Sequence, residues 1–321
     1  FLAAGADEVV VHREAPDDTP FGTRLRRLAG ELRPGGGLVV LGAGSIPLAS
    51  PADLRAFVDA AAADEPGCLA NHRDSADIVA IAHAAETLRD VPLDLASDNA
   101  LPRWLAEVGG VPVRDLRARR RLAMDLDSPL DLLLLEGARG APDMPLPGDP
   151  EAGPVRARLA ALRAIARDPG AELLVTGRTS AADLRWAERH TRSRTRVLVE
   201  ERGLRTAAIG AAVGRPNRRA PRSILGELLD RDGPGSIGRH AAAVSDGALI
   251  DSRVLLAHRL GADERAWPHP EDRFASDLLL ADRVHDPWLA GLTAAAAASP
   301  VPMLLGAHSL VGPGLRLALR G

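Results

Sequence analysis

The strongest constraint on the fold is an alternation of short apolar runs with segments of helical spacing along the chain. Leu38–Leu41 is entirely apolar, as expected for a strand buried on both faces, and Thr23–Leu32 before it has helical spacing. Ser50-Pro51 begins the next helix with an N-cap residue and a proline at the first helical position. Strands that alternate with helices predict an α/β protein with a doubly wound, mainly parallel sheet.

The same spacing predicts the remaining elements of a first domain, residues 1–136. The expected strands are Val9–His12, Asp77–Ala82 and Leu122–Asp125. The expected helices run from Ser50 to about Ala63 and over His83–Leu88, Asn99–Val108 and Leu130–Glu136.

A second α/β unit is expected over residues 155–321, after a linker at 137–154. The stretch Gly140–Pro150 alone holds six prolines or glycines, which favours a linker over a regular element. The clearest later elements are helices Val155–Ala166 and Ala181–His190 and strands Glu172–Thr176, Arg194–Glu200 and Val301–Leu305. The 321 residues are enough for two domains, each with its own core.

Charge and composition exclude several classes of protein. The net charge of −3 gives no field that would attract nucleic acid, and no aromatic residues interleave with the basic run Arg117–Arg121. We interpret that run as a solvated turn, with phosphate binding as the alternative. The single Cys68 excludes an internal disulfide and a cysteine-rich zinc site, and no histidine pair has metal-ligand spacing.

We expect a soluble, cytoplasmic protein without a membrane segment. The longest apolar stretches are near ten residues, whereas a membrane-spanning helix needs roughly 20. The chain starts at Phe1, and Ala3-Ala4-Gly5 is typical of a helix end that leads into a strand. We therefore expect an upstream strand and most of a helix to precede this sequence.

Two polar segments follow predicted strands and lead through a proline into a helix: Gly42–Leu48 and Asp125–Leu132. Open α/β sheets bind ligands at the carboxyl ends of their strands. In an extended segment Asp125 and Asp127 point the same way, so they can share one hard cation such as Mg²⁺. The alternative is that Asp127-Ser128-Pro129 is an N-cap turn without a ligand.

The order of these motifs resembles the nucleotidyltransferases of the nucleotide-diphospho-sugar transferase fold, including molybdenum-cofactor and phospholactate guanylyltransferases. The resemblance covers residues 1–136. It implies Mg²⁺-dependent transfer of a nucleotide from an NTP to a small phosphorylated or hydroxylated acceptor, without a nucleic-acid or membrane partner. It implies Mg²⁺ at Asp125 or Asp127 and identifies no catalytic side chain. The implied nucleotide- and acceptor-binding residues are Gly42, Ser45, Asn71, Arg73, Asp98 and Asn99. For Asp98 and Asn99, capping of the following helix is the alternative.

Two departures from the family pattern favour an alternative function. The family's glycine-rich phosphate loop lies before the first helix and is not in this sequence. The acidic metal ligand expected two residues before Pro47 is Ser45, a neutral and poor ligand for Mg²⁺. The alternative is a catalytically inactive protein that binds a nucleotide or sugar phosphate.

A third possibility places a phosphate-handling activity in the second unit. Thr176–Ser180 lies between a strand and a helix, where Arg178 and backbone N–H groups can hold an anion, although Ser180 as an N-cap explains the same residues. His308, at a strand end, can line such a site. Gly233–Gly238 matches a dinucleotide-binding pattern, but it follows a helix, so we interpret it as a loop.

Overall fold

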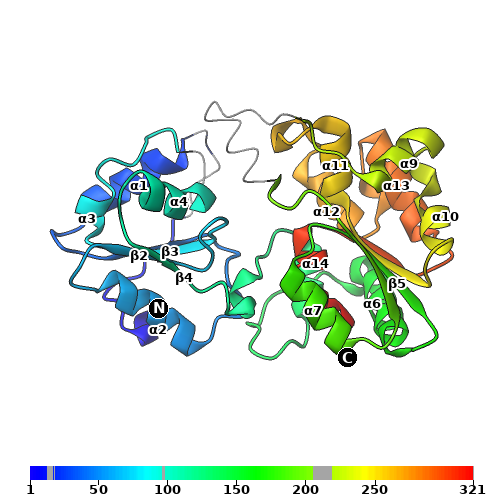
Figure 1. The fold of residues 1–321 in the computed structure, drawn as a ribbon, viewed down its shortest axis with the longest axis horizontal. Helices are drawn as coiled ribbons and strands as arrows, with labels where there is room; N and C mark the ends of the chain where they lie inside the picture. The colour runs from blue at the N-terminus through cyan, green and yellow to red at the C-terminus, as the bar shows by residue number, and fades with distance from the viewer. Residues whose placement is uncertain (13–16, 18, 96–97, 205–218, 321) are drawn as a thin grey trace. The chain divides into compact units, whose positions relative to one another are not determined.

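A computed structural model describes residues 1–12, 17, 19–95, 98–204 and 219–320. The protein is an α/β protein, as predicted, and it divides into two compact units. The first unit is Phe1–Asp125 and the second is Leu126–Gly321. Among the described helices, none is both long enough and apolar enough to cross a membrane. Each unit has its own sheet and its own core (Figure 1).

The sheet of the first unit is mixed. Its strands are β1 (Leu38–Leu41), β2 (Gly67–Ala70), β3 (Ile78–Ala82) and β4 (Val113–Asp115), in the order β1-β3-β2-β4. Strand β3 runs antiparallel to both of its neighbours, and only β2 and β4 are parallel. A mainly parallel sheet was therefore the wrong expectation for this unit. The reason is the short loop 71–77 between β2 and β3, which leaves no room for the crossover that parallel neighbours need.

Helices cover both faces of this sheet (Figure 1). Alternate residues of β3 enter two separate apolar clusters, because successive side chains of a strand point to opposite faces. Ile78 and Ala80 pack with Phe57 of α2, whereas Val79 and Ile81 belong to the cluster that holds Leu25 of α1. The helices are α1 (Phe21–Gly30), α2 (Pro51–Ala61), α3 (Ala84–Thr87) and α4 (Leu101–Glu107), with 3-10 turns η1 (Leu2–Ala4), η2 (Asp98–Ala100) and η3 (Arg120–Ala123).

Two predicted strands of the first unit are wrong. Val9–His12 forms no strand: Val9, Val10 and Val11 are exposed, and no described strand pairs with them. An apolar run becomes a strand only where a neighbour completes its hydrogen bonds. Leu122–Asp125 starts within the turn η3, and Asp125 makes only a single antiparallel bridge, to Ser45.

The second unit is α/β, as predicted, and its sheet is fully parallel. Its strands are β5 (Glu172–Gly177), β6 (Arg194–Val199), β7 (Gly247–Asp251) and β8 (Met303–Gly306), in the order β6-β5-β7-β8. The chain moves from β5 outward to β6 and then crosses back to β7, so the winding reverses between β5 and β7.

Helices lie on both faces of this sheet, with α6 on one side of β5 and α9 and α10 on the other (Figure 1). The helices are α5 (Pro129–Leu135), α6 (Asp149–Arg167), α7 (Ala181–His190), α9 (Ile224–Asp232), α10 (Ile237–Ala242), α11 (Ser252–Leu260), α12 (Pro270–Asp277), α13 (Pro287–Ala297), α14 (His308–Val311) and α15 (Leu315–Leu319). The segment Gly233–Gly238 forms the 3-10 turn η4 (Pro234–Ser236) and the start of α10, after a helix and not after a strand.

The units divide after Asp125, whereas the sequence placed the end of the first domain at residue 136. The difference is α5, which packs within the second unit: Leu130 lies against Gly306 and Leu134 against Gly314. Helix α6 begins at Asp149, within the stretch 137–154 expected as a linker. The first turns of α6 contain two prolines and a glycine, which have low helix propensity, so the sequence did not indicate that the helix begins there.

Candidate functional site

The Gly42–Leu48 segment and Asp125, the first residue of the second motif segment, meet at one edge of the sheet of the first unit. The register pairs Leu41 with Ile78, and Ala70 with both Val79 and Asp115. The carboxyl ends of β1, β2 and β4 therefore lie at the same edge as the start of β3. The loops that leave this edge carry the predicted residues Gly42, Ser45, Asn71 and Arg73.

A tight turn after β1 places Ser45 opposite Asp125. Ser45 N–H donates to Gly42 O at 3.1 Å, and Ser45 and Asp125 form an antiparallel bridge. Side chains of directly paired residues lie on the same face, with Cβ atoms about 5 Å apart. The hydroxyl of Ser45 and the carboxylate of Asp125 are therefore neighbours, so the fold brings together the two motif positions that the sequence analysis linked.

The residue after Ser45 has a strained backbone. Ile46 has a φ of +48°, in the left-handed region that a β-branched residue rarely adopts, and its side chain is buried. Such strain costs about 1–3 kcal/mol, persists only where the surrounding structure enforces it, and clusters at functional sites. The strained backbone at Ile46 therefore favours a functional role for the Gly42–Leu48 loop.

Asn71 forms hydrogen bonds with Asp77 and Leu122 at this edge of the sheet. Its Nδ2 donates to Asp77 Oδ2 and to Leu122 O, both at 2.9 Å, and its Oδ1 accepts from the Asp77 N–H at 2.9 Å. The residue is 3% exposed. Because both ends of its amide serve the fold, Asn71 positions the segment before Asp125, and contact with a ligand is secondary.

Arg73, in the same loop, differs from Asn71. The side chain is half-buried, and its guanidinium makes no hydrogen bond or ion pair with any residue that the structure describes. Half-buried arginines elsewhere in the unit are paired, as Arg24 is with Asp17. Arg73 therefore offers a positive charge and several donors at this edge, which suits a phosphate.

Asn99 reaches the same loop, since its Oδ1 accepts from Ser75 Oγ at 3.1 Å. Asp98 accepts from the N–H of Asn99 at 2.8 Å. Neither side chain caps α4, whose N-cap is Ala100. The capping alternative for these residues is therefore wrong, because Asp98 and Asn99 themselves form the 3-10 turn η2 that precedes the helix.

A buried ion-pair cluster joins the start of α2 to the arginines that precede Asp125 in the chain. Asp53, in the first turn of α2, accepts from Arg119 Nη1 at 2.9 Å and from Arg121 Nε at 2.5 Å, as well as from the N–H and hydroxyl of Ser50. Burial acts to raise the pKa of Asp53, but the hydrogen bonds from Arg121, Ser50 and Arg119 outweigh it and leave that pKa below its usual value.

The sequence analysis missed this cluster. Arg117 pairs with Asp115 at 3.1 Å, so three arginines of the basic run are bound to carboxylates of the same unit. The solvated-turn interpretation overlooked these contacts, and phosphate binding by the run is weakened by them. Asp53 three residues after Ser50 was a recognisable capping box, but its second role could not be found from spacing.

The two predicted metal ligands belong to different units. Asp125 is the last residue of the first unit. In the second unit, Asp127 Oδ2 lies 3.5 Å from His308 Nδ1, and the Asp127 N–H donates to Asp131 Oδ2 at 2.9 Å. Ser128 is the N-cap of α5, with Asp131 accepting its N–H, so the N-cap alternative is confirmed for this segment.

Asp125 and Ser45 fit Mg²⁺ only with help from other ligands. Mg²⁺ usually keeps several waters and takes one or two carboxylates together with the substrate phosphates. A single carboxylate beside a hydroxyl is at the lower limit of that pattern. The donor set can hold Mg²⁺ with a triphosphate, and it is a weak site for the ion alone.

In the second unit, the candidate anion site is occupied by an internal ion pair. Arg178 donates from Nε to Asp251 Oδ2 at 2.6 Å and from Nη2 to Asp251 Oδ1 at 3.0 Å, at the point where the winding reverses. Burial opposes the ionisation of Asp251, but Arg178 prevails and keeps its pKa low. Ser180 accepts from the Asp183 N–H, which confirms the N-cap alternative for Thr176–Ser180.

Glu227, Asp230 and His258 form a metal-like cluster in the second unit. His258 Nδ1 accepts the Ser223 N–H at 3.0 Å, so the neutral ring carries its proton on Nε2, which faces Asp230 Oδ2 at 3.0 Å. A metal would need the lone pair that this proton occupies. The histidine therefore supports the start of α9 and is not a metal ligand in this arrangement.

Comparison with protein-family models, with curated proteins and with solved structures found no match to this chain. The likeness to nucleotidyltransferases thus rests on the motif residues themselves.

Proposed function

We propose that the first unit binds a nucleoside triphosphate with Mg²⁺ and transfers its nucleotide to a small phosphorylated or hydroxylated acceptor. The observation that carries the proposal is the pairing of Ser45 with Asp125 at the carboxyl edge of the sheet. Arg73, at the same edge, makes no contact with another described charge. A nucleotide-diphospho-sugar transferase type of fold for this unit is part of the same proposal.

Each side chain has a defined part in this proposal. Asp125 would hold the metal beside the Ser45 hydroxyl, and Asp127 ranks second because it is not paired with Ser45 and belongs to the second unit. Bound Mg²⁺ supplies charge neutralisation on the phosphates, which is most of what nucleotidyl transfer requires. Arg73 would bind a phosphate oxygen, and the turn Gly42–Ser45 would form part of the surface on which the nucleotide lies. No covalent nucleophile is needed for this chemistry.

A second candidate is nucleotide or sugar-phosphate binding without catalysis. Ser45 favours it, because a hydroxyl stands where the resembling enzymes have a carboxylate. Phosphate handling by the second unit is disfavoured, since the Nε–Nη2 edge of the Arg178 guanidinium is already bound to Asp251.

The test is NTP binding by the whole protein, measured by calorimetry for each of the four common NTPs. Arg73→Gln is expected to weaken binding by about tenfold, the usual effect of losing one charge-assisted hydrogen bond. Arg89→Gln is the matched control, since Arg89 is exposed and makes no side-chain contact with another described residue. Equal losses in both variants would refute a role for Arg73.

Ser45→Asp separates the two candidates. If the site retains its transferase geometry, a second carboxylate strengthens Mg²⁺-dependent NTP binding and raises pyrophosphate release. In a binding protein without catalysis, affinity responds to Mg²⁺ but pyrophosphate release stays at background.

A further inference from the structure

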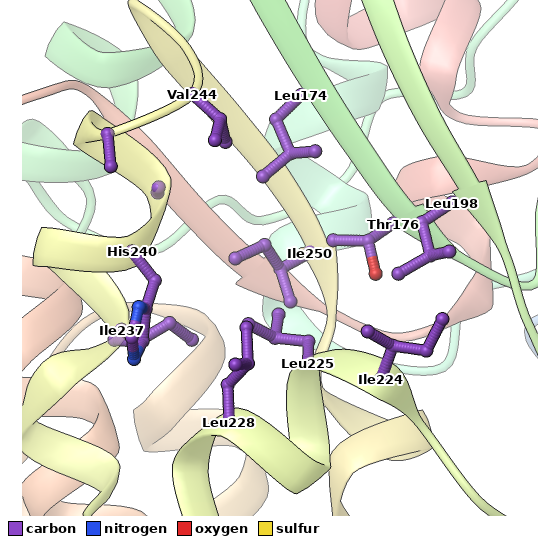
Figure 2. A pocket seen from close by; sticks show the side chains of 12 residues that line it. Leu174, Thr176, Leu198, Ile224, Leu225, Leu228, Ile237, His240, Val244 and Ile250 are labelled. Atoms are coloured by element: carbon purple, nitrogen blue, oxygen red, sulfur yellow. The ribbon is translucent and has the colours of Figure 1, made fainter. Parts of the chain in front are cut away.

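The second unit contains a half-enclosed apolar cavity of about 250 Å³ between its sheet and helices α9 and α10 (Figure 2). Its lining is mainly aliphatic and comes from β5, β6, β7, α9 and α10. Leu174, Leu198, Leu228 and Ile237 are representative, and Ile224 and Val244 are exposed lining residues. No aspartate, glutamate or arginine among the described residues lines the cavity.

The cavity lies on a face of the sheet that its helices cover incompletely. Along β5, Leu173 and Val175 point to the opposite face and are 0% and 1% exposed. Leu174, which lines the cavity, is only half-buried although it is equally apolar. Removing aliphatic surface from water contributes about 25 cal/mol per Å², so an apolar molecule that covered this face would gain binding free energy.

Thr176 gives the cavity one polar feature. The residue is 4% exposed, and its hydroxyl makes no hydrogen bond with a described residue, although its oxygen is not among the fully buried polar atoms that lack a partner. Figure 2 shows its oxygen on the side that faces Ile224. Polar groups inside proteins are usually paired, so a ligand in the cavity could supply the hydrogen-bond partner that this hydroxyl lacks. The other polar lining residue is His240, whose buried Nε2 lies 3.0 Å from Asp232 Oδ2 but makes no hydrogen bond with a described residue.

We propose that this cavity binds an uncharged, mainly apolar small molecule that makes one hydrogen bond to the Thr176 hydroxyl. An apolar cavity of about 150 Å³ engineered in another protein holds benzene, so this larger space suits roughly ten non-hydrogen atoms. A charged ligand is disfavoured because the lining offers no counter-charge. The proposal concerns the second unit and is independent of nucleotide binding by the first.

Indole is a suitable probe, because it is apolar, of the right size, and has one N–H that can donate to Thr176 Oγ1. Indene has nearly the same shape without that donor. Binding of both to the whole protein is measured by ligand-observed NMR titration. We expect the intact protein to bind indole more tightly than indene, and Thr176→Val to weaken indole binding by about tenfold without changing indene binding.

A matched pair of variants locates the site. Ala241 lines the cavity, whereas Ala242 in the same helix does not. Ala241→Leu fills the space and should abolish binding of both probes, and Ala242→Leu should leave it within twofold. The proposal is overturned if the intact protein binds neither probe at millimolar concentration, or if folded Ala241→Leu binds indole normally. Should Ala241→Leu fail to fold, the Thr176→Val comparison decides: equal effects on indole and indene contradict the proposal.

Discussion

Replacing Asp53 with asparagine removes a buried negative charge from contact with two arginines of the first unit. The side chain of Asp53 is fully buried and accepts hydrogen bonds from Arg119 and Arg121 as well as from Ser50. Asparagine keeps the shape and can still accept the Ser50 N–H. Its amide nitrogen, however, must face guanidinium donors, so at least one charge-assisted hydrogen bond is lost.

The size of the effect follows from the exposure of the two partners. A hydrogen bond to a charged group contributes about 1.5–3 kcal/mol, but side chains of Arg119 and Arg121 are 39% and 44% exposed and regain water when released. We therefore expect α2 to lose about 2–3 kcal/mol of stability. This is below the roughly 3–5 kcal/mol of breaking a fully buried ion pair.

The pKa of Asp53 gives the effect a defined pH dependence. Because the folded state lowers this pKa, the stabilisation is present above the ordinary value of 3.8 and is lost as pH falls through the folded value. The difference between Asp53→Asn and the original protein should thus be constant from pH 8 to about pH 5 and shrink at lower pH.

Amide hydrogen exchange of the residues that follow Pro51 in α2 measures this effect locally. A loss of about 2–3 kcal/mol corresponds to exchange that is about 30-fold to 150-fold faster. Asp59→Asn, an exposed position on the same helix, is the control and should change exchange by less than threefold. Unchanged protection in Asp53→Asn would refute the view that this cluster holds the start of α2.

Three further predictions concern the second unit. Burial raises the pKa of Asp131 to about 7 despite its hydrogen bond from Ser309, so its contribution to stability is full below about pH 4 and lost as pH rises to 7. At about 1.4 kcal/mol per pKa unit, the free energy of unfolding should fall by about 4 kcal/mol between about pH 4 and pH 7. Urea unfolding of Asp131→Asn should not show this fall, and the same fall in the variant would contradict the prediction. Arg253→Met should cost about 3–5 kcal/mol because buried Asp277 loses its bidentate partner, and adding Asp277→Leu should restore most of the loss, as chemical denaturation can show. Thr176→Val should stabilise the unit by about 1 kcal/mol, since it removes a buried hydroxyl without a described partner; a lower Tm would contradict this.

The elements found from sequence are those with complete local signals. Leu38–Leu41 is a buried apolar run, and α7 (Ala181–His190) begins at a serine N-cap, so neither depends on distant residues for recognition. Gly67–Ala70 was missed because it contains no β-branched or aromatic residue, and Val113–Asp115 because it is only three residues long. Both segments become strands because neighbouring strands form backbone hydrogen bonds with them.

The site was predictable in its motif positions and not in its internal contacts. Gly42 and Ser45 follow Leu38–Leu41, a strand found from sequence, so their place at a sheet edge was predictable, whereas Asn71 follows the missed strand Gly67–Ala70. The contact of Asp53 with Arg119 and Arg121 joins residues more than sixty positions apart, and no local pattern reports such a pair. The direction of β3 likewise depends on loop length more than on its own residues.

The most direct test of the proposed function is calorimetry of NTP binding to the whole protein with and without Mg²⁺, repeated with Asp125→Asn. Asp64→Asn, an exposed carboxylate in the loop before β2, is the matched control. We expect binding of at least one NTP to strengthen at least tenfold with Mg²⁺, and Asp125→Asn, but not Asp64→Asn, to remove that gain. Affinity that is absent for every NTP, or that does not change with Mg²⁺ or with Asp125→Asn, would contradict a nucleotide site at Ser45 and Asp125.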